Sequence, residues 1–167
     1  MKKDRVLLSG CTILLALAAA PAFATPPSGF TAAQQWKGVY PPLKIDVAAD
    51  RNVDKDDKWD FKLMSKDTSD VYVTRNSIAV AGQSGWHSHP GPSLITVTLG
   101  EITAYESDNP ACAPTRYHAG EGFVDFGDHA HLLRNESGAP AETVAVQFLP
   151  AGATRRIDEP KPTNCDF

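Results

Sequence analysis

Four of the five histidines of this 167-residue chain lie in two short H-x-H pairs, His87 with His89 and His129 with His131. Alternate side chains of a β-strand point to the same face, so each pair can present two imidazole rings in one direction. Neutral imidazole binds divalent transition metals and leaves coordination positions open for water or substrate. The spacing therefore predicts a site for one divalent ion, either Fe, Mn, Zn, Ni or Cu.

We expect His87, His89 and His131 to be the metal ligands. The alternative is a metal-free polar pocket, in which the buried ring nitrogens need other partners. His129 is a possible fourth ligand if its strand extends far enough, and a solvent-exposed residue at the strand end if it does not. Six further candidates could serve the site or could simply be core or turn residues.

Ser93, Tyr105, Phe126 and Gln147 are candidates to line a small-ligand pocket, with Ser93 able to bond a metal-bound water. Aromatic side chains in a barrel, however, also serve as ordinary core. Asp125 and Asp128 could act as general bases or orient His129 or His131, or could simply be turn residues.

We expect strands to position the histidine pairs. After Asp70 the chain has short apolar segments every 8 to 12 residues, a spacing typical of the strands of an all-β fold. The predicted strands cover residues 71–74, 78–81, 86–89, 94–99, 102–105, 122–126, 131–135 and 143–149. Glycine, proline and serine clusters separate them, and no sustained helical stripe is present. One small antiparallel barrel is the predicted fold.

Two stretches resemble the motifs of the cupin family. The first cupin motif contains H-x-H, a glutamate and a glycine, and here His87 and His89 are followed by Ser93 in the glutamate position and by Gly100. In the second motif Gly120, His131 and Asn135 match, whereas Phe126 and Asp128 replace a proline and a glycine.

The resemblance covers about residues 70 to 150 and implies an all-β double-stranded β-helix, the jelly-roll barrel of cupins, with its site inside one open end. Cupins of the common type add the glutamate to three histidines, and some, such as the thiol dioxygenases, use three histidines alone. Ser93 is therefore compatible with a metal but does not establish one.

The first 24 residues resemble a secretory signal peptide. A basic start is followed by an apolar run and by Ala22-Phe23-Ala24, an A-x-A cleavage signature. Leu8-Ser9-Gly10-Cys11 also fits a lipobox, but the long apolar run follows this cysteine rather than preceding it. We expect cleavage after Ala24 and a periplasmic or secreted protein.

Residues 25–69 are predicted to be an N-terminal arm with at most one short helix around 31–37 and an edge strand at 59–63. Residues 70–150 form the predicted barrel and 151–167 a C-terminal tail. Cys112 and Cys165, the two cysteines left after cleavage, are expected to form a disulfide, with two separate buried thiols as the alternative.

Removing residues 1–24, which hold three basic residues and one acidic residue, takes the formal net charge from −4 to −6. This balance argues against nucleic acid and anionic membrane as partners and leaves a small-molecule ligand and a possible homodimer. Two functions stay open: a small-molecule metalloenzyme, with dioxygenase chemistry as one reaction type, and a non-catalytic ligand-binding cupin. The fold does not decide between them.

Overall fold

The structure is a computed structural model that describes residues 24–50 and 58–167. Within these ranges the chain forms strands and loops, and no described helix is long and apolar enough to cross a membrane. The strands are β1 (Ser28–Tyr40), β2 (Lys44–Asp50), β3 (Lys58–Met64), β4 (Ser69–Gln83), β5 (His87–Ser88), β6 (Ser93–Leu99), β7 (Glu101–Glu106), β8 (Thr115–His118), β9 (Gly122–Asp125), β10 (His131–Arg134), β11 (Ala141–Pro150) and β12 (Ile157–Asp158).

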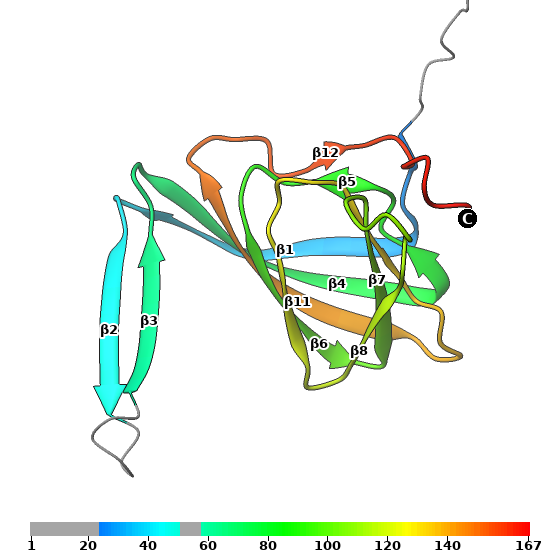
Figure 1. Cartoon of the computed structure of the whole chain (residues 1–167), viewed down its shortest axis with the longest axis horizontal. Helices are drawn as coiled ribbons and strands as arrows, with labels where there is room; N and C mark the ends of the chain where they lie inside the picture. The colour runs from blue at the N-terminus through cyan, green and yellow to red at the C-terminus, as the bar shows by residue number, and fades with distance from the viewer. Residues whose placement is uncertain (1–23, 51–57) are drawn as a thin grey trace, which may run out of the picture.

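Ten of these strands close into a barrel (Figure 1). One side pairs β1, β4, β11, β6 and β9 in that order, and the other pairs β12, β5, β10, β7 and β8, all antiparallel. The two sides join where Arg134 of β10 pairs with Gln83 of β4. This strand order is that of a jelly roll, so the predicted all-β double-stranded β-helix is confirmed.

The alternation of side chains along the central strands explains which residues face inward. In β11 the buried positions are every second residue, from Ala141 to Leu149, and β6 buries Ser93, Ile95 and Val97 in the same way. Period-two burial is what a strand with one core face requires. The predicted strands at 71–74 and 78–81 are one continuous strand, β4, and β8 was not predicted.

The prediction of a helix around residues 31–37 is wrong, because this segment is part of β1. β1 pairs with β4 from Ser28 to Tyr40, with a register shift between Gln34 and Trp36. Hydrogen bonding along a long exposed strand edge outweighs the weak helix propensity of the short segment. The predicted edge strand at 59–63 lies in β3, which pairs with β2 as a hairpin that stands apart from the barrel (Figure 1).

Apolar packing divides into two clusters that leave one end of the barrel polar. Inside the barrel the buried residues are Ile78, Val97, Ile102, Ala104, Leu133 and Ala141. The second cluster consists of Trp86, Tyr105, Cys112, Leu132 and Cys165. Because Leu132 and Leu133 are neighbours on β10, the two clusters lie on opposite faces of this strand.

Cys112 and Cys165 form a disulfide, as predicted, with the two Cα atoms 5.4 Å apart. The bond fixes the C-terminal tail to the loop between β7 and β8. Phe167 packs against Tyr105 with ring centroids 4.4 Å apart, and Arg134 lies over the Phe167 ring. The tail is therefore held against the barrel from the disulfide to its last residue.

Removing this disulfide should destabilise the protein substantially. A cross-link that spans 53 positions contributes on the order of 4 kcal/mol in the chain-entropy model. We expect Cys112→Ser/Cys165→Ser to lower the free energy of unfolding by about 2–5 kcal/mol, measured by urea denaturation. A double variant as stable as the wild type under non-reducing conditions would contradict this expectation.

Candidate metal centre

Three of the four predicted histidines meet at the polar end of the barrel. His87 lies on β5, His89 follows it, and His131 begins β10 directly opposite His87 in the antiparallel register. One ring nitrogen of each residue lies within 4.8 Å of those of the other two. His87 and His131 are buried and the His89 side chain is 9% exposed, so the group is enclosed by protein rather than spread on the surface.

Backbone carbonyl groups set the orientation of two of the rings. Nδ1 of His87 donates to the carbonyl oxygen of Gly85 over 2.8 Å, and Nδ1 of His89 donates to that of Arg155 over 2.6 Å. A carbonyl oxygen can only accept, so the proton must lie on Nδ1 and the lone pair on Nε2. Both rings thus present a basic Nε2, the arrangement that metal-binding histidines need.

Burial also keeps these rings neutral. Desolvation lowers the pKa of His87, His89 and His131 below the ordinary value of 6.5. Repulsion from neighbouring rings lowers the pKa of His87 and His131 further, whereas Asp125 raises that of His89 and His131 without reversing the shift. A protonated imidazole cannot bind a metal, whereas a neutral one can. At neutral pH the group is therefore ready to coordinate a cation without first losing protons.

A row of polar side chains crosses the sheet beside the histidines. Gln147 of β11, Ser93 of β6 and Asp125 of β9 are consecutive partners in the register, so all three point into the barrel. Ser93 Oγ donates to Asp125 Oδ2 over 3.2 Å, and Gln147 Nε2 lies 3.3 Å from Ser93 Oγ. Ser93 and Gln147 line the same cavity as the three histidines, as the sequence predicted for them.

Asp125 brings a buried carboxylate to the position next to Ser93. Its Oδ1 lies 3.4 Å from Nδ1 of His131, and its Oδ2 lies 3.8 Å from Nε2 of His89. Oδ1 also accepts a hydrogen bond from the backbone N–H of Gly127 over 2.8 Å. Gly127 has φ 83° and its Cβ would lie 2.3 Å from the carbonyl oxygen of Gly91, so only glycine permits this turn.

These residues fit a divalent cation. Among the described residues, Asp125 has no Lys or Arg within ion-pair distance, and Nδ1 of His131 is a buried polar atom without a hydrogen-bond partner. Uncompensated buried charge and unsatisfied buried nitrogen both cost free energy. A cation among the three rings would offset the carboxylate charge and would strengthen donation from a protonated His131 Nδ1 to Asp125, whose Oδ1 lies 3.4 Å away. The donor set of three imidazoles with a nearby carboxylate suits Fe, Mn, Zn, Ni or Cu.

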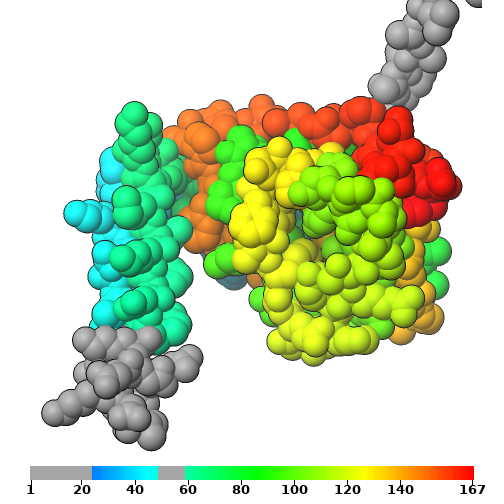
Figure 2. Space-filling model, viewed as in Figure 1, coloured from blue at the N-terminus to red at the C-terminus, as the bar shows by residue number. Residues whose placement is uncertain are grey.

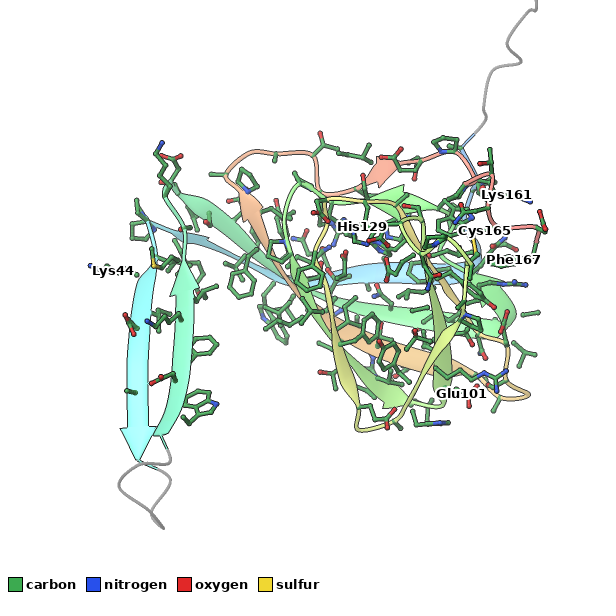
Figure 3. All side chains as sticks on the ribbon, in the orientation of Figure 1. Lys44, Glu101, His129, Lys161, Cys165 and Phe167 are labelled. Atoms are coloured by element: carbon green, nitrogen blue, oxygen red, sulfur yellow. A yellow bond between two sulfur atoms is a disulfide. The ribbon has the colours of Figure 1, made fainter. Side chains whose placement is uncertain are left out.

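His129 does not belong to this group. It lies in the loop before β10, labelled in Figure 3, and its ring bonds to Asp128 over 2.7 Å and to Glu106 over 3.0 Å. Burial alone would lower its pKa, but Asp128, Asp108 and Glu106 raise it above 6.5. His129 thus lies among carboxylates that favour its protonated form, and Asp128 orients this outer histidine rather than His131.

Two predicted pocket residues lie elsewhere. Phe126 is 66% exposed, because it follows Asp125 and the strand alternation turns it outward. Tyr105 is buried in the disulfide cluster on the other face of its sheet, and its hydroxyl donates to Glu136 over 2.9 Å. The two faces of β7 at Tyr105 could not be distinguished beforehand, because both carry buried residues.

Sequence reasoning missed Arg155 and Arg156, which line the cavity together with the histidines. They immediately precede β12, whose Ile157 and Asp158 pair with Ser88 and His87 of β5. Two consecutive arginines in a tail otherwise lacking strand pattern were the only available signal. The tail is therefore a wall of the site and not merely an extension beyond it.

Comparison with known proteins gives structural neighbours only. No protein-family model and no curated protein matches the chain. Similar solved structures include an uncharacterised conserved protein with a double-stranded β-helix domain from Klebsiella pneumoniae. It is 21% identical, the alignment covers 71% of this chain and 85% of that chain, and the TM-score is 0.43. Another is the Cupin_2 domain of an XRE family transcriptional regulator from Enterobacter cloacae. It is 19% identical, the alignment covers 48% of this chain and 82% of that chain, and the TM-score is 0.40.

A third is an oxalate oxidase in complex with the substrate analogue glycolate, which is 23% identical. The alignment covers 46% of this chain, and the TM-score is 0.42. The aligned region spans 41% of that chain, less than half of its length. The names of these three neighbours include a Cupin_2 domain and a double-stranded β-helix domain.

Metal content should depend on the three clustered histidines and not on the fourth. We expect about one divalent ion per wild-type chain and loss of binding in His89→Ala, because two imidazoles remain. His129→Ala is the matched control, since it removes a histidine two positions from His131 without touching the group. Elemental analysis after dialysis measures both, and equal metal content in wild type and His89→Ala would exclude the assigned site.

Asp125 should tighten metal binding. Replacement of a carboxylate that supports metal-bound imidazoles typically costs about 10–100-fold in metal affinity. We expect that loss for Asp125→Asn in competition with a chelator of known affinity. Asp128→Asn, three positions away and exposed, should change the affinity less than twofold, and equal effects of the two changes would contradict the role given to Asp125.

Proposed function

We propose that this protein is a secreted or periplasmic metalloenzyme that acts on a small molecule at the three-histidine centre, with dioxygenase-type chemistry as the reaction class. The observation that carries the proposal is a cavity of about 60 Å³ that is lined by His87, His89 and His131. Three ligands from the protein leave positions that a substrate and a second reactant can occupy. When bound, the metal would supply Lewis-acid polarisation or activation of dioxygen or water.

The cavity restricts what can react there. A single water needs roughly 10–15 Å³ of such space, so the cavity holds about four to six water-sized groups. Its walls combine apolar side chains, such as Ile95, Leu133 and Ala145, with the polar ends of Asn76 and Gln147. A substrate of a few non-hydrogen atoms fits, whereas a sugar polymer or a peptide does not.

The chain's own polar groups are arranged to position a substrate and handle protons. Asp125 is buried beside His131 and is fixed by Ser93 and Gly127, so its carboxylate can orient the ring and accept a proton at Oδ2. Asn76 is fixed by donating from Nδ2 to Thr143 Oγ1 over 3.0 Å. Side chains held by such bonds pre-organise a site before the substrate enters.

The extracytoplasmic location rests on two features of different kinds. Disulfides persist in oxidising compartments, and the Cys112–Cys165 bond is one. The predicted signal peptide ends at Ala24, and nearly all of it lies outside the residues that the structure describes. The location is thus part of the proposal, supported by the disulfide and by the sequence pattern.

An exchangeable water on the metal distinguishes an enzyme from a binding protein. We expect the Mn²⁺-loaded protein to enhance bulk-water proton relaxation, because positions not used by histidine would hold water. The Fe²⁺-loaded protein should consume oxygen with at least one small organic acid or thiol, and His89→Ala should not. A fully loaded protein without exchangeable water would contradict the proposed enzyme and favour the non-catalytic alternative.

A further inference from the structure

The guanidinium group of Arg156 has one nitrogen that lacks a partner. Its Nε donates to Asp158 Oδ1 over 2.6 Å, whereas Nη2 is buried and forms no hydrogen bond with any described residue. Arg156 lines the cavity that contains the three histidines. A buried N–H donor of a permanent cation is costly to leave unsatisfied, so this atom points to a missing acceptor.

The tail holds Arg156 in place. β12 pairs with β5 directly after Arg156, and the N–H of Glu159 donates to the carbonyl of Trp86 over 3.0 Å. Ser88 Oγ donates to Glu159 Oε1 over 2.8 Å, and the disulfide fixes the chain farther on. Arg156 is therefore a rigid element of the site rather than a mobile surface arginine.

Arg155 adds a second cation to the same wall. Its Nη1 donates to Thr74 Oγ1 over 2.6 Å, its guanidinium lies 5.7 Å from the Tyr72 ring centroid, and its carbonyl orients His89. Among described residues it has no carboxylate within ion-pair distance. The cavity is thus lined by two guanidinium groups, one of them without a carboxylate partner, beside a group of imidazoles.

We propose that the cavity binds a short-chain carboxylate, with one carboxylate oxygen accepting from Arg156 Nη2 and the rest of the molecule directed toward the three histidines. This inference rests on the proposed function for the metal end of the ligand. A guanidinium recognises carboxylate through directed, charge-assisted hydrogen bonds. The small volume and the apolar walls of Ile95, Leu133 and Ala145 limit the ligand to a few carbon atoms.

Titration of the Co²⁺-loaded protein with acetate, propionate and lactate tests the proposal. The visible spectrum should change with saturation in wild type, and Arg156→Gln should weaken binding by at least about tenfold, the value of one lost charge-assisted bond. Asp158→Asn is the matched variant, because it removes the carboxylate charge beside Nε, keeps an oxygen that can accept from Nε, and leaves Nη2 unchanged. Arg116→Gln, on β8, is a distant control, and both should bind as wild type.

The possible results separate this inference from the proposed function. Equal carboxylate affinity in wild type and Arg156→Gln would overturn it, and so would equally tight binding of propionamide. Binding of inorganic phosphate as tight as that of acetate would replace a carboxylate site by a general anion site and also overturn it. If the protein takes up no metal, the proposed function fails, and carboxylate-dependent thermal stabilisation of the metal-free wild type, absent in Arg156→Gln, still decides the role of Arg156.

An independent observation concerns the β2–β3 hairpin, which has one apolar and one polar face. The register pairs Ile45 with Leu63 and Val47 with Phe61, and Trp59 stacks on Phe61 with ring centroids 5.6 Å apart. The opposite face carries charged residues such as Lys62 and Asp46, which form an ion pair. Figure 2 shows that the hairpin stands away from the barrel.

This apolar face lacks a cover. Trp59 is 49% exposed, Val47 45% exposed and Phe61 38% exposed. A two-stranded hairpin by itself is marginally stable in water and needs something to pack against. A groove of about 290 Å³ lies between its base and the barrel, lined by Leu63, Met64, Pro92 and Phe148.

The outer face of the barrel carries a matching apolar row. Trp36, Val73, Val146, Leu94 and Val124 are consecutive register partners across β1, β4, β11, β6 and β9. All five point away from the barrel interior, and Trp36, Leu94 and Val124 are at least 44% exposed. Phe148 belongs to the same face and connects the row to the groove at the hairpin base.

We infer that a second copy of this chain covers both surfaces, with each hairpin packed on the outer apolar row of the other copy. Two-fold symmetry allows such self-complementary exchange. Aromatic residues bury roughly 150–250 Å² each, so reciprocal burial of two hairpins and two rows reaches the roughly 800 Å² per partner of a standard interface. A contiguous apolar surface of this extent is unusual on a monomer.

Sedimentation equilibrium of the mature protein tests this inference. We expect a dimer for wild type, a monomer for Phe61→Asp on the hairpin and a monomer for Leu94→Asp on the row. Lys62→Ser, on the polar face of the same strand, should stay dimeric, and metal content reports that each variant is folded. A monomeric wild type, or a dimer that survives both apolar substitutions, would overturn the inference.

Discussion

Three imidazole rings packed against one another in a barrel interior need partners for six ring nitrogens. Two carbonyl groups, those of Gly85 and Arg155, take the Nδ1 protons of His87 and His89 and thereby aim Nε2 of both rings inward. Burial keeps the rings uncharged, so the inward nitrogens carry lone pairs, and the Gln147 amide donates to only one of them, Nε2 of His89, over 3.4 Å. A cation meets this requirement, and the rest of the site is arranged around it.

The C-terminal tail contributes as much to the site as the barrel does. The carbonyl of Arg155 orients His89, Arg156 lines the cavity and has a buried N–H without a partner among the described residues, and β12 holds both residues beside β5. The disulfide and the contact between Phe167 and Tyr105 tie the tail to the opposite side of β10. Stability and site geometry are therefore coupled, because loosening the tail would release a histidine and an arginine together.

Much of this arrangement could be predicted from residue types and spacing. Period-two alternation located most barrel strands, and H-x-H spacing selected the three histidines that converge. His129 and Phe126 were harder, because whether a residue at a strand end points inward depends on where the strand stops, and β10 begins only at His131. β1 was missed because its strand character comes from pairing with β4, a contact remote in sequence.

Asp125 shows how the register carries information that a motif lacks. The position that cupins fill with glutamate holds Ser93, and a motif comparison counts this as a lost carboxylate. The pairing of β6 with β9 places Asp125 directly opposite Ser93, so the neighbouring strand supplies a carboxylate beside the site. Strand register is set by tertiary structure and could not be deduced from either segment alone.

The central claim is that His87, His89 and His131 bind one divalent ion and leave part of its coordination sphere to other ligands. X-ray absorption spectroscopy of the Zn²⁺-loaded wild type tests this most directly, because imidazole rings give a characteristic multiple-scattering pattern. The account predicts three imidazoles at about 2.0–2.1 Å and at least one further light-atom ligand that exchanges with added carboxylate. Four imidazoles, or fewer than three, would contradict it.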